Sequence, residues 1–199
     1  QKTKLSDTSV IPVLDCEISG LPPTVAKRKA VLFVSGRRDS ADLMRPIFEA
    51  LCERHFYLGE FGSATKMKLV ANSMVCVHNL MAAEALNLGK RVGLDPATMV
   101  EVLRDSAAGS STFGFKAPLM VERRFDNGLG PFGFMFGYLS RAEEMAIGAD
   151  ANAPLLSAAQ EVYREAEQQG RHDQDIAAIL EIIESRSSVA AHPKNGDDV

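Results

Sequence analysis

Residues 63–92 read SATKMKLVANSMVCVHNLMAAEALNLGKRV, a run without proline and with a single glycine, Gly89. This run permits one helix of about 28 residues, roughly 42 Å long. Its apolar positions, among them Leu69, Met74 and Leu80, are spread widely around the helix, so more than one side must be buried. Such a helix is typical of the middle of an assembly or of the connection between two domains.

The residues before this helix predict an α/β structure. Short apolar runs at 10–14, 29–34 and 55–58 suit buried strands, and Ser40 can cap a helix between the second and third of them. Three strands and one helix are too few for a stable open sheet. We therefore expect residues 1–62 to be the end of a larger sheet.

The residues after Gly62 predict helices only. We expect an all-helical domain over residues 63–185 and a mobile tail over residues 186–199, which carry no apolar period. After the long helix, further helices are predicted at 95–103, 118–124, 134–148, 154–169 and 173–185. Residues 109–138 interleave aromatic residues with glycines, which suits either a cleft wall or a loop that fills the core.

Composition excludes several classes of function. The 199 residues include 22 basic and 26 acidic side chains, a net charge of −4, which leaves no basic surface for nucleic acid or a membrane. No apolar run approaches the roughly 20 residues of a bilayer span. Neither the three cysteines nor the four histidines have the spacing of a metal site. We expect a cytoplasmic protein without metal.

Lys68 and Asn72 are the first candidate site residues. They are four residues apart on the long helix and so share a face. An ammonium and a carboxamide side by side can bind one hydroxyl or carbonyl oxygen, and a lysine exchanges protons if burial lowers its pKa. Considered alone, a lysine close to Lys66 is more typical of a solvated side chain.

Three further features have two readings each. Ser19 and Gly20 follow an apolar run and can hold a carboxylate by hydroxyl and backbone N–H, or form a plain turn. Arg141 can bind an anionic group, or pair with the neighbouring Glu144 on the surface. Residues 128–133 match the G-x-G-x-x-G spacing of a dinucleotide loop, but a polar turn precedes them, so we interpret the match as chance.

Five segments appear in an order that resembles a known family. They are D-C-E-I-S-G at 15–20, the glycine and lysine motifs within 59–72, A-E-A-L at 83–86, G-L-D-P at 93–96, and the phenylalanine-to-arginine spacing of 134–141. These segments resemble the D-A-P-V-S-G-G, G-x-x-G-S-G-x-x-x-K-x-x-N-N, A-E-A-L, G-L-D-P and F-x6-K-D segments of the β-hydroxyacid dehydrogenases. This is the 3-hydroxyisobutyrate dehydrogenase group of the 6-phosphogluconate dehydrogenase superfamily.

The resemblance implies a nicotinamide-binding Rossmann domain, a long interdomain helix and an all-helical domain. Residues 1–62 would then be the C-terminal part of this Rossmann-type dinucleotide-binding domain. The first 110 or so residues of that family, with their phosphate-binding loop, have no counterpart here. NAD or NADP is the implied cofactor, with Lys68 as general acid/base and Asn72 as its substrate-orienting neighbour. Ser19 and Gly20 are the implied ligands of the substrate carboxylate.

The remaining implied site residues lie in the helical part. By resemblance, Arg141 replaces the family lysine near the nicotinamide and the substrate, and Phe134 forms part of the cleft wall. The chain departs from the family pattern at Leu21, Ala71 and Ala142, which replace a glycine, an asparagine and an aspartate. These departures concern the substrate more than the type of reaction.

The leading hypothesis is an NAD(P)-dependent oxidoreductase acting on a small 3-hydroxy acid or its semialdehyde or oxo form. One alternative is a non-catalytic helical dimerisation module. Another is a reductase of imines or other carbonyl compounds in the same superfamily. We expect a homodimer or homotetramer formed through the helical domain.

Overall fold

The computed structural model describes residues 12–189, which divide into two compact units. The first unit ends at Met74 and the second begins at Val75, so the division falls inside the long helix. The boundary predicted between residues 62 and 63 coincides with the start of that helix. Each unit has a hydrophobic core of its own.

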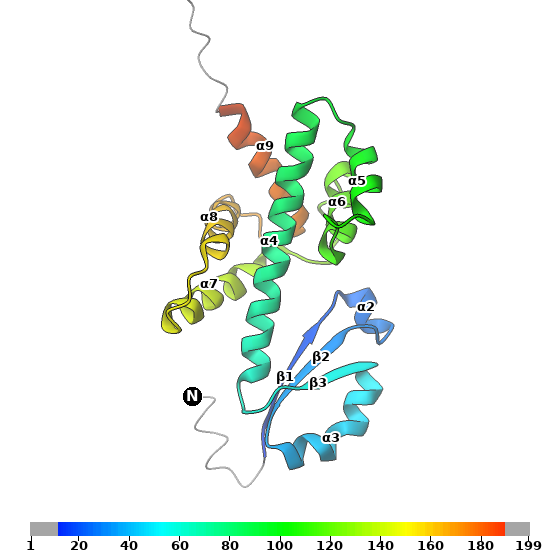
Figure 1. Cartoon of the computed structure of the whole chain (residues 1–199), viewed down its shortest axis with the longest axis vertical. Helices are drawn as coiled ribbons and strands as arrows, with labels where there is room; N and C mark the ends of the chain where they lie inside the picture. The colour runs from blue at the N-terminus through cyan, green and yellow to red at the C-terminus, as the bar shows by residue number, and fades with distance from the viewer. Residues whose placement is uncertain (1–11, 190–199) are drawn as a thin grey trace, which may run out of the picture. The chain divides into compact units, whose positions relative to one another are not determined.

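The first unit is built on a three-stranded sheet (Figure 1). In chain order its elements are β1 (Leu14–Ser19), α2 (Pro22–Ala26), β2 (Val31–Gly36), α3 (Arg38–Leu51) and β3 (Arg54–Tyr57). β2 is the central strand, antiparallel to β1 and parallel to β3. Because parallel neighbours need a crossover connection, α3 joins β2 to β3. The predicted α/β organisation is confirmed.

β1 lies later in the chain than predicted. The apolar run 10–14 suggested a strand, but β1 begins at Leu14, and residues 10 and 11 lie outside the described residues. The strand alternates polar and apolar side chains, so Asp15, Glu17 and Ser19 share one face. A search for continuous apolar runs misses such a strand because only half of its residues are apolar.

The core of the first unit lies between the sheet and α3. Its buried apolar residues are Ala30, Leu32, Val34, Ala41, Phe48 and Cys52. Only some of the apolar side chains of α3 are buried, since Leu43 and Ile47 are 79% and 50% exposed. The helix therefore faces the sheet with Ala41 and Phe48.

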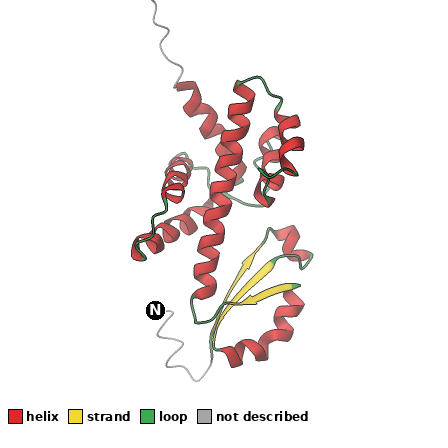
Figure 2. Ribbon diagram, viewed as in Figure 1, coloured by secondary structure: helices red, strands yellow, loops and turns green. Residues whose placement is uncertain are grey.

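The second unit contains only helices among its described residues (Figure 2), as predicted. They are the later part of α4 (Ser63–Arg91), α5 (Pro96–Arg104), α6 (Ser111–Glu122), α7 (Phe132–Gly148), α8 (Pro154–Gln168), the 3₁₀ turn η1 (Ile176–Ala178) and α9 (Ile179–Val189). α5 packs on α6, α7 on α8, and α8 on α9. Residues 75–91 of α4 lie between the α5–α6 pair and the α7–α8 pair (Figure 1).

Several helix boundaries differ from those predicted. α3 begins at Arg38, so Ser40 lies inside that helix and does not cap it. α6 begins at Ser111, not at residue 118, because the Ser110 hydroxyl accepts a hydrogen bond from the Phe113 amide at 3.0 Å and caps the helix. The aromatic and glycine residues of 109–138 therefore lie mostly in α6 and α7. α9 continues to Val189, beyond the predicted end at 185, and the rest of the predicted tail lies outside the described residues.

α4 is long and apolar enough, by length and composition alone, to cross a membrane. This corrects the expectation that no stretch of the chain reaches that length. The helix nevertheless carries Asn79, which is fully buried. Its Nδ2 donates to the Tyr163 hydroxyl at 3.0 Å and to the Ile176 carbonyl at 2.8 Å. A carboxamide bound to two partners inside the helical unit is typical of a core helix.

The helical core also encloses an ion pair. Lys116 of α6 and Asp175, just before η1, have side chains 5% and 0% exposed. The Lys116 ammonium donates to both carboxylate oxygens, at 2.8 and 2.7 Å. Asp175 also accepts from the Ala177 amide at 2.9 Å and so caps η1. No feature of the sequence alone pointed to this pair.

Candidate functional site

The N-terminus of α4 is held by two side chains of the sheet. The Asp15 carboxylate of β1 accepts hydrogen bonds from the Thr65 amide at 2.9 Å and the Thr65 hydroxyl at 2.8 Å. The Ser35 hydroxyl of β2 donates to Asp15 at 3.1 Å and accepts from the Ala64 amide at 3.0 Å. These bonds satisfy amides that the first turn of a helix leaves without partners.

Lys68 lies one turn further along α4 and also contacts β1. Its Nζ donates a hydrogen bond of 2.6 Å to the Ile18 carbonyl oxygen. Burial of the half-buried side chain lowers the pKa of Lys68 below its ordinary 10.5, while the negative charge of Glu17 opposes this shift. Desolvation is the larger effect. Lys68 is therefore a better proton donor than a solvated lysine, and is not the ordinary surface side chain that its neighbourhood in the sequence allowed.

Asn72 follows Lys68 after one turn of α4, on the same helix face. Its side chain is 5% exposed, and no hydrogen bond of its carboxamide is found among the described residues. A buried carboxamide in this condition retains donors and acceptors for a bound molecule. The joint binding of one oxygen by Lys68 and Asn72 stays a prediction.

Ser19 and Gly20 lie at the end of β1, directly after the carbonyl that holds Lys68. Ser19 is half-buried and pairs in register with Val31 of β2. A Cβ atom placed on Gly20 would lie 2.8 Å from the Ala30 Cβ atom, so the glycine is required by packing alone. The structure thus brings the Ser19 segment beside Lys68, and gives Gly20 a steric role that the sequence did not reveal.

Phe134 and Arg141 belong to the second unit, where both lie exposed on α7. The Phe134 ring is 71% exposed. The Arg141 guanidinium lies 4.9 Å from the centroid of the Tyr138 ring, and its Nε donates to the Gly137 carbonyl of its own helix at 3.0 Å. Since residues 134, 138 and 141 follow helical spacing, α7 presents two aromatic rings and a cation along one face.

The glycine-rich residues 128–133 do not form a phosphate-binding loop. The segment directly before them, residues 123–127, is not a strand, and the backbone amides at the start of α7 already have partners. The Phe132 amide donates to the Gln174 carbonyl at 2.9 Å, and the Gly133 amide to the His172 carbonyl at 3.0 Å. A helix N-terminus can bind phosphate only through amides that remain available.

Asp15 and Ser35 are the residues of this region that the sequence analysis missed. One signal was present, since Asp15, Glu17 and Ser19 alternate with apolar residues as in a strand with one polar face. The partner of Asp15 lies 50 residues away, however, and no local pattern indicates it. Among the residues that the structure describes, no cluster of His, Cys, Asp and Glu fits a metal ion.

Residues 62–183 match the sequence family described as NAD-binding of NADP-dependent 3-hydroxyisobutyrate dehydrogenase. The chain is 26% identical over 189 residues to glyoxylate/succinic semialdehyde reductase 2 of Arabidopsis thaliana, covering 93% of this chain and 51% of that protein. It is 28% identical over 166 residues to the cytokine-like nuclear factor N-PAC of Anopheles gambiae, covering 83% and 29%. The chain thus spans about half the length of the reductase and less than a third of the nuclear factor.

A solved structure shares the fold. The 3-hydroxyisobutyrate dehydrogenase of Mycobacterium tuberculosis, determined with L-serine, matches with a TM-score of 0.80 at 21% identity. The match covers 90% of this chain and 64% of that one. The likeness shows that the chain has a known fold.

Proposed function

The chain belongs to the NADP-dependent 3-hydroxyisobutyrate dehydrogenase family, and we propose that it supplies the proton-transfer and helical parts of an NAD(P)-dependent oxidoreductase. The reaction would move a hydride between nicotinamide and a small 3-hydroxy acid, or its semialdehyde or oxo form. One observation carries the proposal: the half-buried Lys68 ammonium is held against the carbonyl of Ile18, beside Ser19 and one helical turn before the buried Asn72.

Lys68 is the general acid and base of this reaction. In the direction of reduction its ammonium donates a proton to the carbonyl oxygen of the substrate, and in oxidation the neutral amine accepts the hydroxyl proton. Burial lowers the pKa of Lys68 from its ordinary value, which makes the ammonium a stronger acid and increases the fraction of neutral amine that can accept a proton. Asn72 holds the same oxygen through its carboxamide, and the Ser19 hydroxyl and Gly20 amide hold the substrate carboxylate.

The exposed face of α7 fits a nicotinamide and an anionic substrate. Phe134 and Tyr138 offer flat apolar surfaces, and Arg141 offers a guanidinium that stacks on Tyr138 and keeps donors for a carboxylate or phosphate. When bound, the nicotinamide supplies or accepts the hydride. The glycine-rich loop that binds the cofactor phosphates in dinucleotide-binding domains is not among the described residues.

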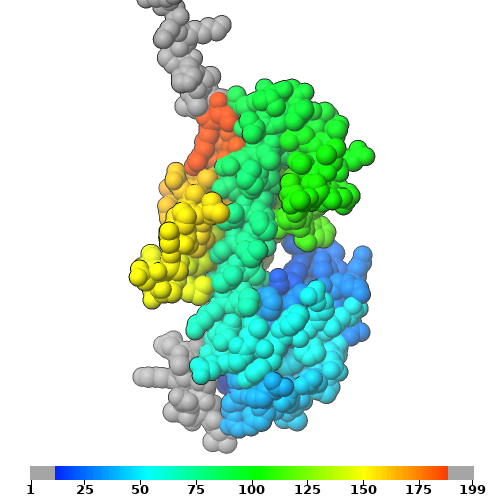
Figure 3. Space-filling view, in the orientation of Figure 1, coloured from blue at the N-terminus to red at the C-terminus, as the bar shows by residue number. Residues whose placement is uncertain are grey.

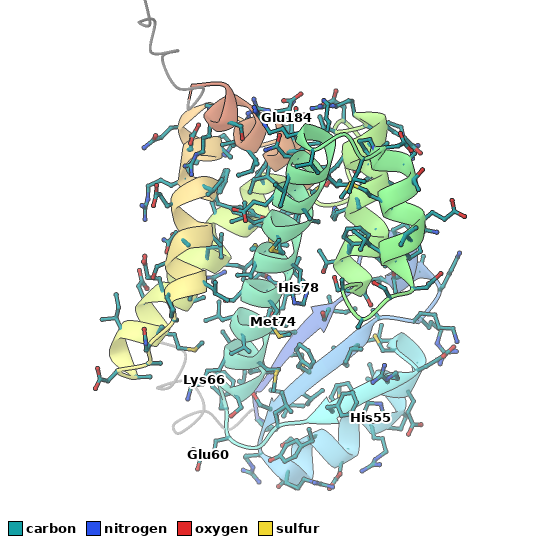
Figure 4. All side chains as sticks on the ribbon, turned by 45° about the horizontal axis from the view of Figure 1, so that its top comes forward. His55, Glu60, Lys66, Met74, His78 and Glu184 are labelled. Atoms are coloured by element: carbon teal, nitrogen blue, oxygen red, sulfur yellow. The ribbon has the colours of Figure 1, made fainter. Side chains whose placement is uncertain are left out.

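The test compares two lysines of the same helix. In a polypeptide in which this chain follows a dinucleotide-binding domain, Lys68→Ala should lower kcat by about 10²- to 10⁴-fold and leave the cofactor Kd unchanged. Lys66→Ala is the matched control, since Lys66 is exposed and lies two residues earlier on α4 (Figure 4). It should change kcat less than twofold. An unchanged kcat in the Lys68 variant would refute the proposed role.

A substrate comparison separates the proposed reaction from that of an imine reductase. The substrates would be 3-hydroxyisobutyrate, succinic semialdehyde, glyoxylate and a cyclic imine without a carboxylate. A site that holds a carboxylate should prefer the acids by at least tenfold in kcat/KM. Preference for the imine would favour the alternative activity within the superfamily.

A second candidate function, assembly, rests on the surface of α4. Its exposed apolar residues follow the 3–4 spacing of a helix–helix seam, with exposed fractions rising from 40% to 64%: Met67, Val70, Met74, Met81 and Leu88. Figure 3 shows the surface of α4 within the helical unit as a band that the neighbouring helices leave uncovered. A seam of this kind suits a second copy of the chain.

Light scattering after size-exclusion chromatography tests the assembly. The wild-type chain at micromolar concentration should have the mass of a dimer or tetramer, and Met81→Glu with Leu88→Glu should give a monomer. Val102→Glu on α5, which replaces a residue that is 64% exposed outside the seam, is the control and should leave the mass unchanged. A wild-type monomer would exclude this candidate.

A further inference from the structure

α4 lacks a cap of its own in the local sequence. Gly62 precedes the helix, and no acidic residue lies in its first turn. The Ala64 and Thr65 amides are instead bound by Ser35 and Asp15, which lie 29 and 50 residues earlier in the chain. The cap of this 29-residue helix is therefore tertiary.

The capping group is buried and fully engaged. Asp15 is 8% exposed and Ser35 is fully buried. Between them they accept or donate four hydrogen bonds of 2.8 to 3.1 Å. A carboxylate at this place also interacts favourably with the positive end of the helix dipole. Burial of both side chains leaves the helix start little freedom to move.

Three hydrogen bonds join β1 to α4 at two places. The first is the Asp15–Thr65 contact, and the second is the bond from the Lys68 ammonium to the Ile18 carbonyl. The two contacts are three residues apart on each element, about 10 Å along the strand and about 4.5 Å along the helix. Two separate attachments fix both the sliding and the rotation of the helix against the strand.

We propose that Asp15 is a positioning residue, which sets the register of α4 on β1 and thereby the place of the Lys68 ammonium beside Ser19. The effect of Asp15 on catalysis rests on the proposed function. Its positioning of α4 does not depend on that function. Displacement of a reacting group by about 1 Å can cost about 100-fold in rate. The loss of Asp15 should therefore lower the reaction rate by displacing Lys68.

The first experiment needs no activity. In the 199-residue chain with ¹³C-labelled lysine, NMR titration follows the Lys68 side chain. Asp15→Ala should release Lys68 towards solvent, so that its pKa rises towards the ordinary value. Asp95→Ala is the matched control, because Asp95 caps α5 through the Thr98 amide at 2.8 Å and its loss weakens a helix of the other unit. It should leave the Lys68 titration unchanged.

The second experiment measures the catalytic consequence in the active polypeptide described above. Asp15→Ala should lower kcat by about 10- to 100-fold, with a smaller effect on the KM of the substrate and none on the cofactor Kd. If Lys68→Ala retains activity while Asp15→Ala still moves the Lys68 titration, the proposed function fails and the positioning role stands. If folded Asp15→Ala moves neither Lys68 nor kcat, the positioning role is overturned.

A milder variant covers the case in which Asp15→Ala does not fold. Thr65→Val keeps the backbone amide bond to Asp15 and removes only the hydroxyl bond of 2.8 Å. It should raise the pKa of Lys68 by less than Asp15→Ala does, and lower kcat a few-fold. A Lys68 titration identical to that of the wild type would then count against the inference.

Discussion

Replacement of Lys116 by methionine should destabilise the helical unit strongly. The lysine ammonium lies 2.7 and 2.8 Å from the two oxygens of Asp175, and the two side chains are 5% and 0% exposed. Methionine has a similar length, so the change creates little cavity. What remains is a buried carboxylate that keeps one donor, the Ala177 amide.

The expected cost follows from this loss of charge compensation. Removal of one partner of a buried ion pair typically costs about 3–5 kcal/mol, because the other charge stays in a medium that solvates it poorly. For a chain of this size that corresponds to a fall of roughly 10 °C in Tm. Lys66→Met, at an exposed position of α4, should change the free energy of unfolding by less than about 0.5 kcal/mol.

The assay is urea unfolding followed by circular dichroism at 222 nm, with the midpoint and slope fitted for each variant. The double variant Lys116→Met with Asp175→Asn provides the decisive comparison. It removes the buried charge but keeps an oxygen that can cap η1, so its cost should fall to about 1–2 kcal/mol. A single variant that costs less than about 1 kcal/mol would refute the reasoning, as would a double variant no more stable than the single one.

Three further predictions concern the first unit and the helical core. Glu17→Gln should lower the pKa of Lys68 further, because the carboxylate favours the charged ammonium, and NMR titration of labelled lysine measures the midpoint; a rise would contradict this. Gly20→Ala should cost about 1–3 kcal/mol in unfolding free energy through overlap with the Ala30 side chain, and adding Ala30→Gly should recover much of that loss. Tyr163→Phe should cost about 1–2 kcal/mol in urea unfolding, since it removes the buried oxygen that accepts a hydrogen bond from the Asn79 amide; a neutral effect would show that this bond contributes little.

Local patterns predicted most of the secondary structure. The absence of proline over residues 63–92 predicted α4, which ends at Arg91, and Asp95 followed by a proline predicted the start of α5. The cap of α5 is local, since Asp95 accepts from the Thr98 amide, whereas the cap of α4 comes from the distant Ser35 and Asp15. β1 was misplaced because its apolar residues alternate with polar ones, and α6 began early because the cap at Ser110 outweighed the glycine and proline that follow.

The candidate site was predictable only where its geometry is local. Lys68 and Asn72 share a face because four residues make about one helical turn, whatever surrounds the helix. The burial that lowers the pKa of Lys68 is a different matter. It depends on β1, whose Ile18 carbonyl lies 50 residues away in the chain.

The same separation explains the contacts that no inspection of the sequence revealed. Asp15 and Thr65 are 50 residues apart, and Lys116 and Asp175 are 59 apart. Propensity, capping and periodicity act over a few residues, so the sequence alone established the order of strands and helices and the residues that share a helix face. Which distant side chains meet depends on how those elements pack. Only the tertiary structure therefore decided that Asp15 caps α4, that Lys68 lies beside Ser19, and that the helical core encloses a charge pair.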